Sequence, residues 1–481
     1  MINSTLKQKT IKGISWSLID RFGNQFIKVI IYVILARLLT PEDFGLIGIM
    51  MVTLVFAQVF ITGGFGEAFI QKKEVTDLDA CTVFYTNIFV SIIIYGILWI
   101  TSPFIAKFYS QPELLILIRV MGLIIIINAC NVIQIAQLTR AVNFRRHAKI
   151  NLIAALLSGL SGISAAYYGL GVWSLVILQI INCSLVTLGL WVTSKWKLTA
   201  QFSIESFRGL FSFGMWVLSS KMIVAILDNI YILTIGKFFP VIQLGYYTQA
   251  RRFQEISSKQ IAGAISVVSF SVFSKLQKDL PQLKKSVRKI LTNTMIFMLP
   301  LMLIIILIAK PLVILLLTSK WLPMVPYLQL LCIVGILSPM HSVNVQIIIS
   351  QGMSRLNFYI SSVKMIMRIL NIFITFRWGI SYIIIGEIII STIGLFIDTY
   401  YSKKVINYGL IEQLYDIRYI VIHGLIGLSM AYLICLLIEN QLLFIISNMA
   451  IVIVVYILLH YIYNRDSLIE LKNSFNLIKY K

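Results

Sequence analysis

Residues 16–45 read WSLIDRFGNQFIKVIIYVILARLLTPEDFG. Most of this stretch is apolar, and it is long enough for a membrane-spanning helix, which needs about 20 mainly apolar residues. It nevertheless contains Asp20, Arg21, Asn24 and Lys28. Each charged residue near the centre of a spanning helix costs roughly 2.5 to 3.5 kcal/mol on insertion scales. Such residues normally face protein or water and indicate a transport route.

The composition of the whole chain indicates that this segment lies in a membrane. Of the 481 residues, 59% are hydrophobic and only 12% are charged, and the mean hydropathy is +0.90. Soluble globular proteins have about 25% charged residues, so the sequence predicts an all-α polytopic membrane protein. The five cysteines stand in apolar surroundings without CxxC or Cys/His spacing, so neither a disulfide framework nor a metal site is expected.

Fourteen segments are long and apolar enough to be spans. They lie near residues 13–37, 44–66, 80–101, 113–136, 147–168, 171–193, 210–235, 243–273, 290–309, 325–349, 356–376, 379–401, 417–437 and 442–463. With the N-terminus in the cytoplasm, the cytoplasmic segments hold 26 Lys and Arg residues and the external loops hold 6. This asymmetry satisfies the positive-inside rule and predicts that both termini are cytoplasmic. It also explains the net charge of +22, so no nucleic-acid partner is expected.

The opening stretch has a counterpart in the second half of the chain. Residues 216–245 read WVLSSKMIVAILDNIYILTIGKFFPVIQLG, a weak match to residues 16–45. The Trp-to-Pro spacing is 25 residues in the first copy and 24 in the second, and the Pro-to-Gly spacing is 4 and then 5. Both copies begin a helix from the cytoplasmic side. The pattern predicts a parallel repeat about an axis along the membrane normal, in which two pseudo-symmetric lobes surround a central cavity.

This repeat predicts the domain organisation. Residues 1–194 would form an N-terminal lobe of six spans and residues 210–401 a C-terminal lobe of six more. Residues 195–209 would be a cytoplasmic linker, in which Ser203 is a candidate N-cap of a short interfacial helix; a plain cytoplasmic loop is the alternative. Residues 402–481 would hold the last two spans and a cytoplasmic tail.

Polar side chains recur at helical spacing on the first span. Ser17, Arg21, Asn24 and Lys28 lie at i, i+4, i+7 and i+11, which is one face of an α-helix. We expect this stripe to face an aqueous cavity. The alternative is that Arg21 and Lys28 bond to backbone carbonyls of neighbouring helices in a packed bundle.

Other spans carry similar polar residues. The stripes with this spacing are Thr248, Arg252, Glu255 and Lys259 on 243–273, and Lys364, Arg368, Asn371 and Thr375 on 356–376; 210–235 carries Lys221 and Asp228, seven residues apart. We expect Glu255 to neutralise one of Arg251 and Arg252. Solvation of these two arginines near the outer mouth is the alternative interpretation.

A cavity with these walls is net positive and suits an anion, and planar guanidinium groups suit phosphate oxygens in particular. The candidate substrate-binding residues are Arg21, Asn24, Lys28, Arg251, Arg252, Lys259, Lys364 and Arg368. Acids inside the membrane can pass protons or hold a cation, or they can simply pair with a basic neighbour. The candidates for coupling to H+ or Na+ are Asp20, Asp228 and Glu387, and Asp398 is a further acid of this kind.

An enzyme is a different class of hypothesis. A membrane glycosyltransferase that uses lipid-linked sugars usually needs an acidic pair in an external loop, and Glu42 and Asp43 follow the first span. A local explanation fits these acids better: Thr40 is the N-cap, Pro41 is the first helical residue, and the acids complement the helix dipole. No catalytic residue is therefore expected.

Several stretches of the chain are similar to one known family. ISWSLIDRFGNQ, ARLLTPEDFGLIGIM, GGFGEAFIQKKE, LGYYTQARRF and SVFSKLQKD resemble Wzx-type polysaccharide flippases of the multidrug/oligosaccharidyl-lipid/polysaccharide exporter superfamily. The resemblance covers roughly residues 10 to 400. It implies two lobes of six helices around a central cavity and two accessory C-terminal helices.

The resemblance also implies a function. Family members move undecaprenyl-diphosphate-linked oligosaccharides across the bacterial inner membrane by alternating access, for surface polysaccharides such as lipopolysaccharide. Arg21, Lys28, Arg251 and Arg252 would hold the diphosphate or acidic sugars. The expected partners are the lipid-linked oligosaccharide, membrane lipids, a polysaccharide polymerase and glycosyltransferases, with no cofactor. The alternatives are a cation-coupled multidrug exporter, in which Asp20 would be the coupling acid, and a membrane glycosyltransferase or polymerase.

Overall fold

The structure is a computed structural model, and it describes residues 2–62, 64–72, 74–141, 144–194, 196–435, 438 and 440–463. The regular elements in these ranges are all helices. The chain divides into two compact units, Met1–Gly245 and Tyr246–Lys481. The division into lobes at residues 194 and 210 stays a prediction.

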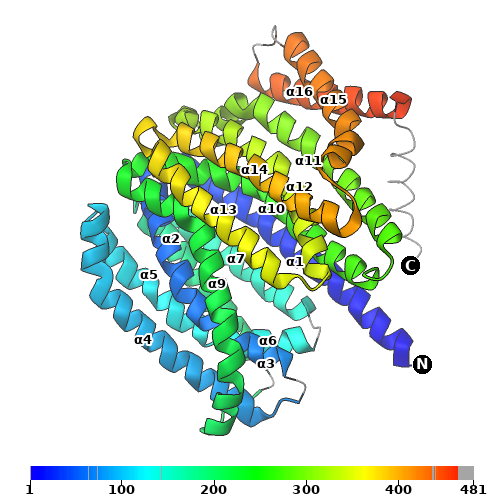
Figure 1. Cartoon of the computed structure of the whole chain (residues 1–481). Helices are drawn as coiled ribbons and strands as arrows, with labels where there is room; N and C mark the ends of the chain where they lie inside the picture. Colours follow the sequence, from blue (N-terminus) through cyan, green and yellow to red (C-terminus); the bar gives the residue numbers. More distant parts are fainter. Residues whose placement is uncertain are drawn as a thin grey trace. The chain divides into compact units, whose positions relative to one another are not determined.

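The first unit contains nine helices and the beginning of a tenth, as far as the described residues show (Figure 1). They are α1 (Ile2–Leu38), α2 (Pro41–Thr62), α3 (Phe65–Gln71), α4 (Asp77–Tyr109), α5 (Leu114–Ala129), α6 (Val132–Arg140), α7 (Phe144–Tyr167), α8 (Trp173–Thr193) and α9 (Ile204–Phe238), and α10 (Val241–Lys275) begins here and continues in the second unit. α7 packs against both α1 and α8. Small residues allow this packing: Gly159 of α7 lies under Ile31, and Gly162 lies against Leu178.

The second unit contains the rest of α10 and the remaining helices. They are α11 (Leu280–Leu317), η1 (Ser319–Met324), α12 (Val325–Ser350), α13 (Ser354–Thr375), η2 (Phe376–Trp378), α14 (Ile380–Ile406), α15 (Leu410–Cys435) and α16 (Gln441–Tyr463). α14 packs against α12 and α13, and α11 packs against α12, α15 and α16. Their apolar core includes Leu291 and Leu299 of α11, Ile347 of α12 and Ile417 of α15, all buried.

Local sequence signals determine where several helices begin. The backbone N–H and the hydroxyl of Thr40 both donate to Asp43 Oδ2 at 2.8 Å, and the Asp43 N–H donates to Thr40 Oγ1 at 3.3 Å. This confirms the predicted cap at the start of α2. Ser203 accepts a hydrogen bond from the N–H of Ser206 and caps α9, so the predicted N-cap is confirmed. The expectation of a short helix there is wrong, because α9 runs for 35 residues.

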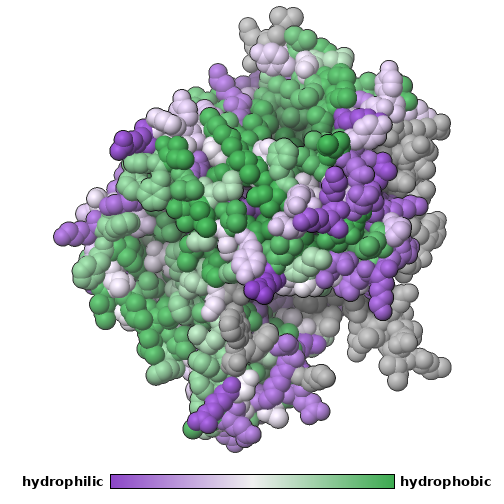
Figure 2. Space-filling model, viewed as in Figure 1, coloured by the Kyte–Doolittle hydropathy of each residue, from purple (hydrophilic) through white to green (hydrophobic). Residues whose placement is uncertain are grey.

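The surface of the helices is apolar where that of a soluble protein would be polar. On α14 the exposed large side chains recur every three or four residues: Ile385, Ile389, Ile393, Phe396 and Tyr400. The opposite side of the same helix buries Asp398 and Ser402. Figure 2 shows such apolar surface over α13 and α14 in the second unit and over α4 in the first. Apolar residues outside and polar residues inside are what a lipid environment requires.

The structure confirms an all-helical polytopic membrane protein. Within the described ranges, eleven helices are long and apolar enough to cross a membrane, or twelve if α5 and α6, bent by 41°, form one span. α1 and α10 coincide with two further predicted spans, but they carry the polar stripes and are not among these eleven or twelve. The total of fourteen spans stays a prediction.

The two copies of the sequence repeat form similar corners. α1 ends at Leu38 and α2 begins at Pro41, while α9 ends at Phe238 and α10 begins at Val241. In both copies two residues separate a long helix from the next one.

These two corners touch each other within the first unit. A Cβ atom added to Gly45 would lie 2.1 Å from the carbonyl oxygen of Val241, and one added to Gly245 would lie 1.8 Å from that of Pro41. Gly45 and Gly245 are 200 residues apart in the sequence, and so are Pro41 and Val241. The contact is therefore reciprocal, as across a two-fold axis. Only glycine allows two backbones to approach so closely.

Candidate functional site

The polar stripe of α1 is partly satisfied by α7. Asp20 accepts hydrogen bonds from Asn24 Nδ2 at 3.0 Å and from Asn151 Nδ2 at 3.2 Å, and His147 Nδ1 lies 3.1 Å from Asp20 Oδ2. Asn24 is therefore held by Asp20. The side chains of Arg21 and Lys28 on the same helix are exposed. The Ser17 side chain lies outside the described residues.

Lys221 of α9 has an acidic partner that its own helix does not supply. Its Nζ atom bonds to Glu67 Oε1 of α3, and both side chains are about 40% exposed. Arg140 anchors α3 by donating to the carbonyl oxygens of Phe69 and Ile70. Lys221 of α9 is therefore paired with an acid of α3.

A cluster of charges joins α10, α13 and α14 in the second unit. Arg251 Nε donates to Glu255 Oε1 at 2.8 Å, which confirms that Glu255 neutralises one of the two arginines of α10. Glu387 interacts electrostatically with Arg251 and with Arg368 of α13. Arg251 and Arg368 are thus grouped around acids, so this part of the molecule is less positive than the basic stripes alone suggest.

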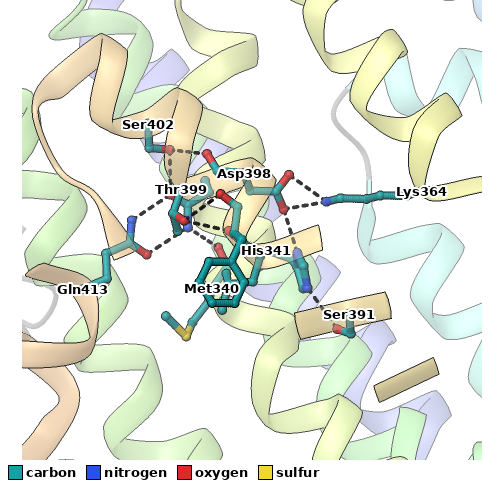
Figure 3. A network of polar contacts seen from close by, with 11 residues as sticks. Met340, His341, Lys364, Ser391, Asp398, Thr399, Ser402 and Gln413 are labelled. Atoms are coloured by element: carbon teal, nitrogen blue, oxygen red, sulfur yellow. Dashed lines mark hydrogen bonds and ion pairs between the residues drawn. The ribbon is translucent and has the colours of Figure 1, made fainter. Parts of the chain in front are cut away.

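Lys364, Asp398 and His341 form a second network, shown in Figure 3. Lys364 Nζ of α13 donates to both carboxylate oxygens of Asp398 of α14, at 2.7 and 2.6 Å. His341 Nδ1 of α12 lies 2.7 Å from Asp398 Oδ2, and its Nε2 lies 3.0 Å from Ser391 Oγ. The Asp398 side chain is fully buried, whereas the side chains of Lys364 and His341 are 19% and 21% exposed. The carboxylate is inside the helix packing, and its two basic partners reach the surface.

Amide groups continue the polar chain beyond Asp398. Ser402 Oγ donates to Asn344 Oδ1 at 2.6 Å, and Asn344 and Gln413 exchange two hydrogen bonds at 2.8 and 3.0 Å (Figure 3). Gln413 then donates to the carbonyl oxygen of Tyr408, between α14 and α15. Burial and the hydrogen bond to Asp416 raise the pKa of the Tyr408 hydroxyl above its usual value, so it stays protonated.

Two glycines of α14 make room for the polar side chains of α13. A Cβ atom at Gly394 would lie 2.9 Å from Lys364 Cε, and one at Gly386 would lie 1.6 Å from Asn371 Oδ1. Asn371 Nδ2 uses this space to donate to the carbonyl oxygen of Ile383 at 3.0 Å. Glycine at positions 386 and 394 of α14 therefore leaves space for Asn371 and Lys364, two residues of the polar stripe on α13.

Sequence reasoning missed part of this network although a signal was present. Glu387, Ser391, Asp398 and Ser402 lie at i, i+4, i+11 and i+15 on α14, which also places them along one face of the helix. His341 stands on α12 among other polar residues, including Ser342 and Asn344, and no regular spacing distinguishes it from them.

The three remaining predicted residues differ in exposure. Arg252 of α10 is half-buried, Asp228 of α9 is exposed, and the Lys259 side chain lies outside the described residues. Among the described residues no group of three or more His, Cys, Asp or Glu is placed to hold a metal ion.

Residues 34–326 match the family model described as "Polysaccharide biosynthesis protein". The chain belongs to this family. It is 25% identical over 377 residues to the "Teichuronic acid biosynthesis protein TuaB" of Bacillus subtilis, which covers 78% of each chain. It is 24% identical over 335 residues to the "Lipopolysaccharide biosynthesis protein WzxC" of Escherichia coli, covering 69% of this chain and 68% of the relative.

A solved structure supports the fold. The structure titled "Lipid II flippase MurJ, inward closed conformation" matches with a TM-score of 0.77 and 17% identity, covering 95% of this chain and 99% of that chain. The match to the polysaccharide biosynthesis family includes Arg251 and Glu255 but ends before Lys364 and Asp398. The network in Figure 3 therefore lies in a part of the chain that the family model does not describe.

Proposed function

We propose that this protein is a flippase that moves an undecaprenyl-diphosphate-linked oligosaccharide from the inner to the outer leaflet of the bacterial cytoplasmic membrane by alternating access. It would serve surface polysaccharide biosynthesis together with glycosyltransferases and a polymerase. Membership of the polysaccharide biosynthesis family, the multi-pass helical architecture and the cations within membrane helices support this proposal. The distribution of basic residues supports cytoplasmic termini.

The observation that carries the proposal is the network of Lys364, Asp398 and His341. A lone ammonium group within a membrane is costly, and the two oxygens of Asp398 offset this cost for Lys364. Because Lys364 is partly exposed and Asp398 is buried, an anion can approach the cation without displacing the helix that carries the acid. A diphosphate oxygen makes the same kind of charge-assisted hydrogen bond as a carboxylate. Lys364 would thus exchange Asp398 for the diphosphate.

This exchange provides a physical reason for coupling to an ion. When the diphosphate binds Lys364, the carboxylate of Asp398 loses its cation and becomes a buried charge without compensation. Uptake of H+ or Na+ would remove that penalty. His341 is placed to pass a proton, because its Nδ1 atom lies 2.7 Å from Asp398 Oδ2. Asp20, Asp228 and Glu387 remain the other proposed coupling acids.

The other predicted cations would add contacts to the diphosphate or to acidic sugars. Arg251 and Arg368 are grouped with Glu255 and Glu387, so the same exchange of a carboxylate for a phosphate applies to them. The remaining proposed contacts are Arg21, Asn24, Lys28, Arg252 and Lys259.

The two alternative functions, a cation-coupled multidrug exporter and a membrane glycosyltransferase, require charged residues of other kinds or in other places. A cation-coupled multidrug exporter needs an acidic or neutral binding surface, whereas most of the stripes here contain cations. A membrane glycosyltransferase needs acids that can reach substrate in an external loop. Asp43 is held instead by three hydrogen bonds with Thr40.

The test is glycan export in a strain that lacks its own flippase. Lys364→Ala alone leaves Asp398 without its cation and can fail by misfolding. The double variant Lys364→Met with Asp398→Asn removes both charges and should restore the amount of inserted protein while export stays absent. Lys310→Gln, at an exposed lysine of α11, is the matched control and should export normally.

Delivery of glycan to the outer surface and the amount of membrane protein are measured side by side. Wild-type export by the double variant at normal abundance would refute the role of Lys364. A second arm tests α1: Arg21→Lys should retain part of the activity because it keeps the charge, and Arg21→Glu should abolish export. Full export by Arg21→Glu would remove Arg21 from the proposed site.

A further inference from the structure

An apolar groove lies between α2, α4 and α9 in the first unit. Its volume is about 610 Å³, and its walls are almost entirely apolar. They include Phe56 and Phe60 of α2, Phe104 and Phe108 of α4 and Leu233 of α9. Volumes of roughly 300 to 1,000 Å³ are typical of pockets that hold one small ligand. The groove is therefore large enough for a bound molecule.

Water is a poor occupant for this groove, because a buried water molecule needs two to four polar partners. Several wall side chains are also exposed to the surroundings: Phe104 is 71%, Phe108 53% and Ile97 51% exposed. In a membrane protein such exposed apolar side chains face lipid. A single acyl chain is apolar, narrow and available at high concentration in the membrane.

One end of the groove carries positive charge. The Lys237 ammonium group lies 4.3 Å from the centre of the Phe108 ring and donates to the Phe108 carbonyl oxygen. An ammonium group has three N–H donors, so it can also bind a phosphate oxygen. Lys107, next to Phe108 in the last turn of α4, is exposed as well. An anionic headgroup at this end would therefore meet complementary charge.

We propose that this groove binds an anionic glycerophospholipid, with one acyl chain between α2, α4 and α9 and the phosphate at Lys237. The size of the groove favours this occupant over the cargo, whose undecaprenyl chain is much longer than one acyl chain. The site lies within the first unit and uses none of the residues assigned to cargo or ion coupling. It is therefore independent of the proposed function.

The bound lipid would fix the outer part of α9. Tyr109 lines the groove and packs on Gly236, where a Cβ atom would lie 3.2 Å from Tyr109 Cε1 and 3.2 Å from Ile49 Cγ1. An acyl chain in the groove contacts α2, α4 and α9 at once. The lipid should therefore stabilise the packing of these three helices, and its loss should lower the thermal stability of the protein.

The experiment compares phosphatidylglycerol with phosphatidylethanolamine bound to the purified full-length protein, by native mass spectrometry and by thermal unfolding in nanodiscs of each lipid. Lys237→Gln removes the cation, and Leu233→Trp fills the groove. Lys310→Gln and Ile116→Trp are the matched controls, at an exposed lysine of α11 and an exposed apolar residue of α5.

The wild-type protein and both controls should prefer phosphatidylglycerol, and Lys237→Gln should reduce this preference about five-fold, as expected for one lysine near an anionic lipid. Leu233→Trp should lose the tightly bound lipid of either kind. An unchanged preference in Lys237→Gln, or unchanged lipid retention in Leu233→Trp, would overturn the proposal. Lipid-linked oligosaccharide in the groove in place of phospholipid would overturn it too.

Discussion

The reciprocal contact of Gly45 and Gly245 leads to a sharp prediction about stability. In Gly45→Ala or Gly245→Ala the new methyl group would lie 2.1 or 1.8 Å from a backbone carbonyl oxygen. Real Cβ atoms essentially never come closer than 3.0 Å to another heavy atom, so the two corners must separate by roughly 1 Å. Backbone atoms cannot turn away as the end of a flexible side chain can. Each substitution should therefore disturb the contact between the corners.

Two opposing effects determine how much stability the Gly45→Ala and Gly245→Ala variants should lose. Overpacking of a tight contact costs about 1 to 3 kcal/mol, and Ala in place of Gly within a helix returns about 0.5 to 1 kcal/mol. For a unit of this size, 1 kcal/mol corresponds to a change in Tm of roughly 2 to 4 °C. The net cost is therefore at most about 2.5 kcal/mol, and we expect each variant to lower the Tm by up to about 10 °C.

The control is Gly96→Ala in α4, because nothing lies within 4 Å of the added Cβ atom. It gains helix propensity without a clash, so its Tm should stay the same or rise. Thermal unfolding of the purified variants, followed by intrinsic fluorescence, measures all three. The double variant at positions 45 and 245 should lose less than the sum of the two single losses, because the first methyl group already separates the corners. The reasoning is refuted if the variants at Gly45 and Gly245 are as stable as Gly96→Ala.

Three other predictions concern charges. Lys364→Ala or Asp398→Ala should each lower the free energy of unfolding by about 3 to 5 kcal/mol, because each leaves the other charge without its partner. The double variant should lose less than either single variant. If thermal unfolding shows that the two losses add, Lys364 and Asp398 do not form a buried ion pair. Lys221 and Glu67 are about 40% exposed, so a double-mutant cycle should give only about 0 to 1 kcal/mol of coupling, and a coupling as large as that of the buried pair would contradict this assignment. A cysteine introduced at residues 141–146 should not be labelled from outside intact cells; ready labelling there would reverse the membrane topology.

Features that depend on nearby residues could be predicted well from the sequence. The cap formed by Thr40 and the cap formed by Ser203 each involve residues three apart. The pair of Arg251 and Glu255 is four residues apart on one helix. At such distances the helix itself fixes the geometry, so periodicity is enough to identify the partners.

Pairs between helices could not be predicted in this way. Lys221 and Glu67 are 154 residues apart, and Lys364 and Asp398 are 34 residues apart. The stripes identified Lys364 and Arg368 as cations within the membrane, but nothing local indicates which helix supplies the acid. The sequence therefore identified these cations, and the structure shows which acids of other helices pair with Lys221 and Lys364.

The sequence by itself determined the membrane class, the helical architecture and the positions of the polar stripes, because hydrophobicity and helical period are properties of neighbouring residues. The tertiary structure alone decided which charges neutralise each other, where Gly386 and Gly394 admit side chains of α13, and that Gly45 and Gly245 bring two corners into contact. These features depend on the distance between segments that are remote in the chain. Packing fixes that distance, and a charge within a membrane is stable only if packing brings it a partner.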